Sequence, residues 1–222
     1  MKFLLNSFIN TLPTQDNLKL WGKMFSDKCH LCKNEDITLH CLNGSKVALK
    51  QGRYTWRHDN ILNYIVNCVD KSKFTIFSDI SGHQTSNGGT VPPSMTVTSL
   101  KPDVVVIDKK EKQAVIYELT SPFESNIHRQ HKYKCDKYAH FESDVKQYKT
   151  KVVAFEVGSR GLLTPENTQR LSDMHKHCIS KHIKKSIFIS NIRALASLSS
   201  YYIFTARKQT SWELTDRLNP PL

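Results

Sequence analysis

The spacing of apolar side chains separates helices from strands along this chain. Between residues 53 and 70, apolar positions recur every three or four residues, which predicts a helix with one buried face. Four shorter apolar runs, bounded by charged or turn-forming residues, predict strands. The helical stripe consists of Ile61, Leu62, Ile65, Val66 and Val69, and the strand-like runs lie at residues 73–82, 104–107, 114–117 and 151–161.

Further helices are predicted on both sides of these strands. Residues 1–24 indicate one amphipathic helix or two short helices broken near Pro13. Residues 125–147 indicate another helix. The sequence Thr164-Pro165-Glu166 is typical of a helix start, because proline is tolerated in the first turn, and a last helix is expected over residues 186–206.

The order of these elements favours an α/β protein with a central mixed sheet flanked by helices. We expect a helical, Cys/His-bearing segment at residues 1–50 and the α/β domain at residues 51–222. The loop at residues 81–95 is rich in glycine, serine and proline and is expected to be mobile. The tail at residues 218–222 is expected to be frayed.

The net charge indicates the class of partner that the chain binds. The 222 residues carry a formal charge of +12 and a sequence pI near 9.4. A surplus of this size favours a polyanionic partner, most often a nucleic acid such as DNA or RNA, over a merely solvated basic surface. The chain has no apolar stretch long enough to span a membrane and no visible export signal. Six cysteines without the density of a disulfide scaffold favour an intracellular, reducing compartment.

Two carboxylates border the predicted hairpin. Asp103 precedes its first strand and Glu118 follows its second, so antiparallel pairing would bring both to one edge of the sheet. Carboxylate oxygens suit Mg²⁺ or Mn²⁺, and such a cation can polarise a phosphate and activate water. Asp79 ends the preceding apolar run and is a further ligand candidate. The plainer interpretation is that these acids are solvated strand ends.

The spacing Pro102-Asp103, then Glu118-Leu119-Thr120, is the PD…(D/E)xK arrangement of restriction-like nucleases, with threonine where lysine is usual. Phosphodiester cleavage needs a cation near the attacking water and the scissile phosphate. The following helix offers Lys134 and Lys137, three residues apart on one face, as a lysine that has migrated. His131 lies on the same face as Lys134. The sequence leaves open which lysine approaches the acids.

These motifs, together with others in the same order, resemble the restriction-like endonuclease region of non-LTR retrotransposon polyproteins. The segments are "LKLWGKMFSDKCHLC", "GRYTWRHDNIL", "KPD", "ELTSPFESNI", "HKYKCDKY", "FEVGSRGLL" and "SYYIFTARKQTSW", and they cover nearly the whole chain. The resemblance implies a restriction-endonuclease-like fold. It implies Asp103 and Glu118 as catalytic acids, Asp79 as an additional acid, and Lys134 or Lys137 as the migrated lysine, with Tyr138 in the family position after the lysine.

The same resemblance implies a biological setting. The enzyme would nick target DNA in the nucleus and leave a 3′-hydroxyl that primes reverse transcription, beside a reverse transcriptase domain of the parent element. Because the chain has no polymerase domain, we expect a fragment, a truncated element or a domesticated descendant. Two other functions stay open: a nucleic-acid-binding remnant without catalysis, and a structural or partner-binding domain of the same fold. The target sequence and the oligomeric state are not predicted.

A possible zinc module lies near the N-terminus. Cys29, Cys32 and His40 have the spacing of a zinc knuckle, and the family resembled carries C-x2-C-x7-H-x4-C here. The fourth position of that pattern falls on Ser45. Either Cys41 or His30 replaces the missing ligand, or zinc binds weakly with water as the fourth ligand, or the site has decayed. The alternative is a reduced loop that binds no metal.

Several basic and aromatic side chains are candidates for DNA contact. Arginine suits phosphate, and aromatic rings can stack on unpaired bases. In each case the alternative is structural: the aromatic rings lie in the core with their arginines capping or pairing, and the glycine-flanked arginine is a turn residue. The candidates are Arg53, Trp56, Arg57 and His58 in "GRYTWRHD", and Arg160 in "VGSRG".

Overall fold

The computed structural model describes residues 2–80, 101–139 and 148–212. The chain divides into two compact units, Met1–Arg57 with Ser197–Leu222, and His58–Ala196. The domain boundary predicted at residue 50 stays a prediction, because these units are defined by contacts alone. The predicted loop at 81–95, the end of the predicted helix 125–147 and the tail at 218–222 lie wholly or mostly outside the described residues.

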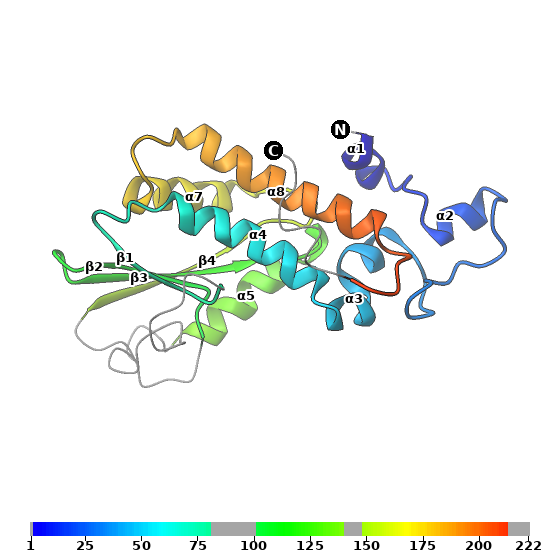
Figure 1. The fold of residues 1–222 in the computed structure, drawn as a ribbon, viewed down its shortest axis with the longest axis horizontal. Helices are drawn as coiled ribbons and strands as arrows, with labels where there is room; N and C mark the ends of the chain where they lie inside the picture. Colours follow the sequence, from blue (N-terminus) through cyan, green and yellow to red (C-terminus); the bar gives the residue numbers. More distant parts are fainter. Residues whose placement is uncertain (1, 81–100, 140–147, 213–222) are drawn as a thin grey trace. The chain divides into compact units, whose positions relative to one another are not determined.

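Helices and strands follow the order that the apolar pattern predicts (Figure 1). The N-terminal stretch forms two short helices rather than one, as the break near Pro13 allowed. None of the helices in the described ranges is long and apolar enough to cross a membrane. The elements are α1 (Lys2–Phe8), α2 (Gln15–Leu20), the π-helical turn η1 (His40–Gly44), α3 (Lys46–Lys50), α4 (Arg53–Cys68), β1 (Thr75–Ser78), β2 (Val104–Asp108), β3 (Gln113–Thr120), the 3₁₀ turn η2 (Glu124–Asn126), α5 (Ile127–Tyr138), β4 (Lys149–Glu156), α7 (Pro165–Cys178) and α8 (Lys185–Thr205).

The larger unit is built on one mixed sheet in the order β1-β2-β3-β4. The pairs β1–β2 and β2–β3 are antiparallel, so the predicted hairpin is confirmed, and β4 joins β3 in parallel. The four residues Val104–Ile107 are all buried, because β2 is a central strand whose two faces are both covered. The chain is therefore an α/β protein with a mixed sheet, as predicted.

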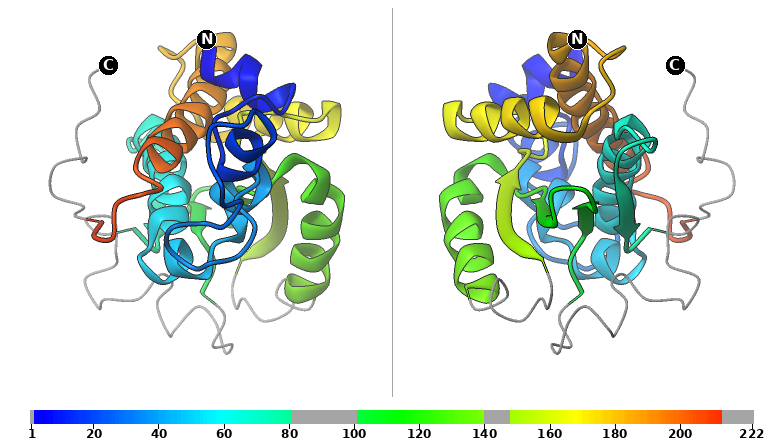
Figure 2. Two further views of the ribbon diagram at one scale, coloured as in Figure 1. Left: turned by 90° about the vertical axis from the view of Figure 1, so that its right-hand side faces the viewer. Right: turned by 90° about the vertical axis from the view of Figure 1, so that its left-hand side faces the viewer.

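Helices cover both faces of this sheet. On one face, apolar residues of α4, α7 and α8 pack on Val104, Val106, Tyr117 and Leu119 in the main core. On the other face, Tyr138 of α5 packs in a smaller cluster with residues of β2 and β3. Within this unit, Figure 2 shows the sheet between α5 on one side and α4 and α7 on the other. Alternate residues of one strand thus face different helices, which decides which side chains meet α5.

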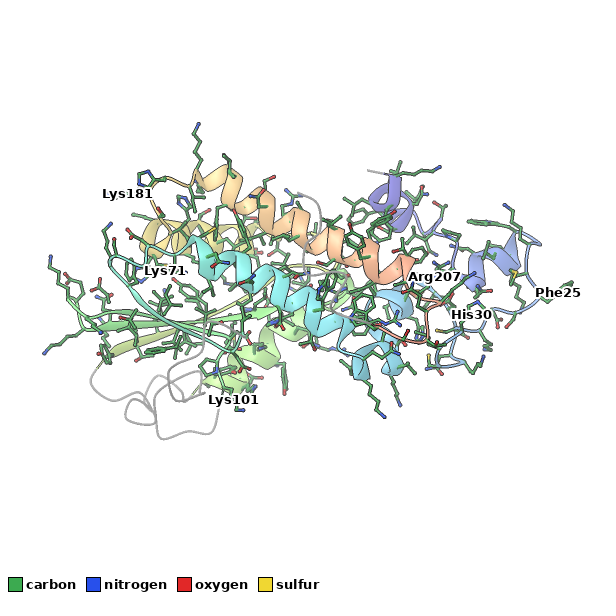
Figure 3. The ribbon with its side chains drawn as sticks, viewed as in Figure 1. Phe25, His30, Lys71, Lys101, Lys181 and Arg207 are labelled. Carbon is green, nitrogen blue, oxygen red and sulfur yellow. The ribbon has the colours of Figure 1, made fainter. Side chains whose placement is uncertain are left out.

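Threonine side chains cap the N-termini of two helices, and one of them lies at the helix start predicted from Thr164-Pro165-Glu166. The Thr164 side chain accepts a hydrogen bond from the Asn167 N–H, and Pro165 lies in the first turn of α7. In the smaller unit, Thr14 caps α2 in the same way. Exposed Lys71 follows α4, and exposed Lys181 follows α7 (Figure 3).

Candidate active site

The two predicted acids meet through backbone hydrogen bonds of the hairpin. Val104 pairs with Tyr117, which sets Asp103 opposite Glu118. The Asp103 N–H donates to Glu118 Oε1 at 3.0 Å, and the Leu119 N–H donates to Asp103 Oδ2 at 2.8 Å. Both carboxylates are therefore held in place by the β2–β3 pairing, even though Asp103 lies just outside β2.

Lys134 completes this group from α5. Its Nζ lies 2.7 Å from Glu118 Oε2 and 3.7 Å from Asp103 Oδ2. Glu118 is fully buried, and a buried carboxylate is strongly unfavourable unless it is paired and hydrogen-bonded. The ammonium group of Lys134 and the Asp103 N–H supply those partners. The sequence left Lys134 and Lys137 open, and the structure brings Lys134 to the acids.

Lys137 and Asp79 do not join the group. The Lys137 side chain is exposed, and its ammonium lies over the Tyr138 ring, 4.9 Å from the centroid. Asp79 is bound to Asp103 only through its backbone N–H, at 3.2 Å. Its side chain is exposed and forms no hydrogen bond or ion pair with the two acids. Asp79 follows directly after β1, which ends at Ser78, and its place as a third acid of the group stays a prediction.

His58 is a neighbour of the acids that the sequence assigned to DNA contact. Its Nε2 lies 3.4 Å from Asp103 Oδ2 and its Nδ1 lies 2.9 Å from Asp59 Oδ1. The ring is thus held between two carboxylates. Forty-five residues separate His58 from Asp103, so only the packing of α4 beside the start of β2 brings them together. No local sequence signal indicated this contact.

Threonine replaces the usual lysine without taking over its role. Thr120 lies two residues after Glu118 on the same face of β3. Its Oγ1 is buried and has no hydrogen-bond partner among the described residues. A hydroxyl carries no positive charge, and the ammonium group that contacts the two acids is that of Lys134.

Burial and charge set the protonation of the group. Burial raises the pKa of Glu118 to about 7, and the charge of Asp103 adds to this effect against the opposing influence of Lys134. Burial would also raise the pKa of Asp103, but its hydrogen bond to His58 and the charges of His58 and Lys134 lower it below the usual value. Despite burial, its bonds to Asp103 and Asp59 raise the pKa of His58 to about 9.

The raised pKa of Glu118 predicts a pH-dependent stability. Its pKa is higher in the folded than in the unfolded state, so ionisation destabilises the fold as pH rises from about 4.5 to about 7. Glutamine resembles the protonated carboxyl. Glu118→Gln is therefore expected to raise the free energy of unfolding at pH 8 by about 1–3 kcal/mol. Urea unfolding without metal at pH 4.5, 6 and 8 measures it.

The pH profile serves as the internal control for this variant. At pH 4.5 the parent and Glu118→Gln should differ little, since the carboxyl is then largely protonated in the folded state. A variant less stable than the parent at pH 8 would show that the bond from Lys134 outweighs the burial of the carboxylate, and that the stated direction is wrong.

The smaller unit holds the predicted Cys/His cluster. The ligand atoms of Cys29, Cys32 and His40 all lie within 4.8 Å of one another and could hold a metal ion. Cys32 Sγ and His40 Nε2 are 3.0 Å apart. Burial lowers the pKa of His40, which favours the neutral imidazole that binds metals.

Neither predicted replacement for the fourth ligand joins this cluster. Cys41 donates its thiol to Asp36 Oδ1 at 3.0 Å, and burial followed by the Asp36 charge raises its pKa. His30 is exposed, with its Nε2 3.1 Å from the side-chain nitrogen of Gln15. Ser45 lies where the family pattern places it, with Oγ 3.8 Å from Cys32 Sγ. The cluster therefore has three ligands and a serine beside them.

Three of the predicted DNA contacts are core residues, so that prediction is corrected. Arg53 and Arg57 are 0% and 1% exposed, and Trp56 is 5% exposed. Arg53 Nη1 donates to the Ala206 carbonyl at 2.7 Å, and Arg57 Nη1 donates to the Leu42 carbonyl at 2.9 Å. Guanidinium groups engaged with buried carbonyls cannot reach phosphate.

Arg160 also has partners within the chain. Its Nε lies 2.6 Å from Glu124 Oε2, and its guanidinium lies over the Phe123 ring, 4.5 Å from the centroid. Its backbone N–H donates to Glu124 Oε1 at 2.7 Å. This arrangement fixes the turn after β4, as the structural alternative proposed, and the arginine is not directed to a phosphate site in this structure.

One oxygen of the Asp103 carboxylate has no partner within the described ranges. All hydrogen bonds and ion pairs that this carboxylate forms with the described residues involve Oδ2, and Oδ1 has none. Both oxygens of Glu118 are occupied, Oε1 by the Asp103 N–H and Oε2 by Lys134. No model of a known protein family matches this chain, and no curated protein matches it.

Proposed function

We propose that this chain is a divalent-metal-dependent DNA endonuclease of the restriction-like class. The observation that carries the proposal is the meeting of Asp103, Glu118 and Lys134, which come from the entrance of β2, from β3 and from α5. The residue set is the acid pair plus lysine of the PD…(D/E)xK pattern, with the lysine on the helix. The net charge of +12 supports a nucleic-acid substrate.

Each residue has a distinct part in the proposed reaction. Asp103 and Glu118 would hold a Mg²⁺ or Mn²⁺ ion, which supplies positive charge at the scissile phosphate and lowers the pKa of a bound water. Lys134 places its ammonium group where negative charge develops on the phosphate oxygens. His58 orients the Asp103 carboxylate through its contact with Oδ2, and Oδ1 is left without a partner among the described residues. His58 is in this view a positioning residue.

The setting of this activity follows the family resemblance. The nick would leave a 3′-hydroxyl that primes reverse transcription of a retroelement, in the nucleus and together with a reverse transcriptase domain. Cys29, Cys32 and His40 would hold Zn²⁺ as a knuckle that lacks its fourth protein ligand. RNA of the element is a further candidate partner.

Nicking of supercoiled plasmid tests the proposal. The chain with Mg²⁺ or Mn²⁺ is expected to convert supercoiled plasmid to open circles, and EDTA is expected to suppress the conversion. Asp103→Asn protein purified in parallel reports any contaminating nuclease. If no metal supports nicking, or if the variant nicks as fast as the parent, the chain is not this enzyme.

A nucleic-acid-binding protein without catalysis is the second candidate. It is favoured by the ion pair between Lys134 and Glu118, which already neutralises the carboxylate that a metal would need. Thr120 and Ser45 both depart from the family pattern and fit partial decay. This candidate predicts salt-sensitive DNA binding without nicking in the same experiment.

A further inference from the structure

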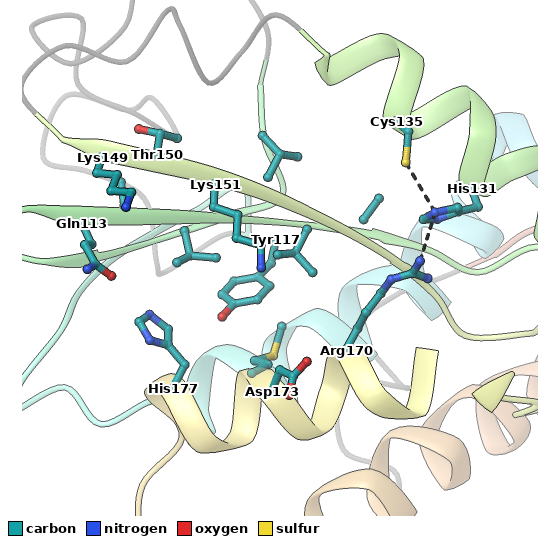
Figure 4. Close-up of a pocket in the computed structure, with 16 residues that line it drawn as sticks. Gln113, Tyr117, His131, Cys135, Lys149, Thr150, Lys151, Arg170, Asp173 and His177 are labelled. Carbon is teal, nitrogen blue, oxygen red and sulfur yellow. Dashed lines mark hydrogen bonds between the residues drawn. The ribbon is translucent and has the colours of Figure 1, made fainter. Parts of the chain in front are cut away.

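A second site lies at the edge of the sheet, away from the acids. Strand β4 is the last strand of the sheet, and a pocket of about 520 Å³ opens between β4, α5 and α7. Figure 4 shows Lys149, Thr150 and Lys151 on β4, Arg170, Asp173 and His177 on α7, and His131 and Cys135 on α5. The volume is within the range of pockets that take nucleotide-sized ligands.

The lysines face the opposite side of the sheet from Glu118. Glu118 and its pairing partner Ala154 lie in the phase of β3 and β4 that faces α5. Lys149 and Lys151 lie in the other phase, together with Val153, which packs against the main core. The pocket also reaches α5 through His131 and Cys135, but Asp103, Glu118 and Lys134 do not line it.

The pocket lining has more basic than acidic side chains. The basic ones are His131, Lys149, Lys151, Arg170 and His177, and the one carboxylate is Asp173. Among the described residues, neither lysine nor Arg170 forms a salt bridge, whereas His131 contacts Glu156. Lysine and arginine side chains that converge without salt-bridge partners provide the charge and the donors that an anion requires.

Arg170 is held in place by Asn167 and His131. Its Nη1 donates to Asn167 Oδ1 at 2.9 Å, and its Nη2 lies 3.2 Å from His131 Nε2. His131 Nδ1 in turn lies 3.1 Å from Oε1 of Glu156, which is 1% exposed. The guanidinium is thus oriented before any ligand arrives, and Arg170 lines the pocket with its guanidinium directed toward His131 (Figure 4).

We propose that this pocket binds the phosphate of a nucleotide, with Lys149 and Lys151 on one wall and Arg170 on the other. Phosphate fits the site because arginine offers paired donors and lysine offers mobile charge. The nucleotide belongs to a nucleic-acid strand or is free in solution, and the two sources share this chemistry. The proposal is independent of cleavage and adds a binding site that the nuclease centre does not contain.

The pocket is tested by binding measurements in EDTA, because the proposed metal-dependent cleavage cannot proceed there. Lys149→Glu/Lys151→Glu is expected to weaken binding of a fluorescent single-stranded oligonucleotide about tenfold or more at 0.1 M salt. The slope of log affinity against log salt should fall by about 1 to 1.5. Both lysines are exposed, so the fold should tolerate the changes. The matched control is Lys184→Glu/Lys185→Glu, with the same charge change on exposed lysines outside the pocket.

Adenosine monophosphate distinguishes the two sources of phosphate. It should shift the NMR ring signals of His131 and His177 in the parent and not in the pocket variant. Shifts with AMP while oligonucleotide affinity is unchanged in the variant would support the pocket and assign it to free nucleotides. The proposal would be overturned if the pocket and control variants lost oligonucleotide affinity equally. It would also be overturned if AMP caused no shift of the histidine signals and the pocket variant showed no selective loss of affinity. Loss of nicking with intact binding would concern the nuclease alone.

Discussion

Replacing Asp103 with asparagine or Lys134 with methionine is expected to lower the rate of Mg²⁺-dependent nicking by about 10²–10³-fold or more. Asparagine in place of Asp103 would keep the hydrogen-bonded position next to the Leu119 N–H but lose the charge that binds a cation. Methionine in place of Lys134 would fill the space of the lysine stem and lose the ammonium group that lies 2.7 Å from Glu118. Single-turnover nicking of supercoiled plasmid measures both.

Lys137→Met is the matched control for the lysine. It removes the same charge from the same helix, three residues away, at an exposed position outside the acid group. We expect its rate to stay within about threefold of the parent, since a distant surface charge is screened. If Lys137→Met lost as much activity as Lys134→Met, the loss would reflect the general basic surface. If Lys134→Met kept its rate, the proposed electrostatic role would be wrong.

The periodicity of apolar residues predicts most of the secondary structure. The helix at Arg53–Cys68 and the hairpin of β2 and β3 follow from spacing and from short buried runs, which are local properties of the chain. The position of β4 beside β3 does not follow from local spacing. The two parallel strands are joined by a long connection, and the sequence of neither strand indicates that they pair. The pairing of the C-terminal part of α8 with the N-terminal residues in one compact unit is equally non-local.

The candidate site was partly predictable for the same reason. A hairpin places the residues before and after its strands opposite each other, so Asp103 and Glu118 could be paired from sequence alone. The choice between Lys134 and Lys137 could not be made, since it depends on the rotation of α5 over the sheet. The position of His58 depends on packing between segments far apart in the sequence.

The sequence left two interpretations of Arg53 and Arg57 open, which are phosphate contact and a structural role. The structure favours the structural role, because their guanidinium groups donate to the carbonyls of Ala206 and Leu42. Arg53 and Ala206 are 153 residues apart, so no local pattern could indicate that contact. Which donor reaches a buried carbonyl is decided by tertiary packing.

Ser45→Cys is expected to raise the affinity of the smaller unit for Zn²⁺ by about 10²-fold. Structural zinc sites bind with roughly 10–16 kcal/mol over four ligands, so one added thiolate contributes a few kcal/mol. Ser45 Oγ lies 3.8 Å from Cys32 Sγ, at the position where the knuckle pattern has its last cysteine. The same oxygen accepts the Ala48 N–H at 3.2 Å and caps α3, so the exchange also costs about 1 kcal/mol of helix stability.

Competition with a chromophoric chelator measures the affinity, and Co²⁺ spectra count the thiolate ligands, two in the parent and three in Ser45→Cys. Ser45→Ala should bind zinc within about threefold of the parent, since a serine hydroxyl is not among the usual zinc ligands. Cys41→Ser should likewise have little effect, because the Cys41 thiol donates to Asp36 and its raised pKa opposes the thiolate. Were Cys41→Ser to weaken zinc as much as Cys29→Ser does, Cys41 would be the fourth ligand. The loop around it would then rearrange when the metal binds, because the Cys41 thiol donates to the Asp36 carboxylate in this structure.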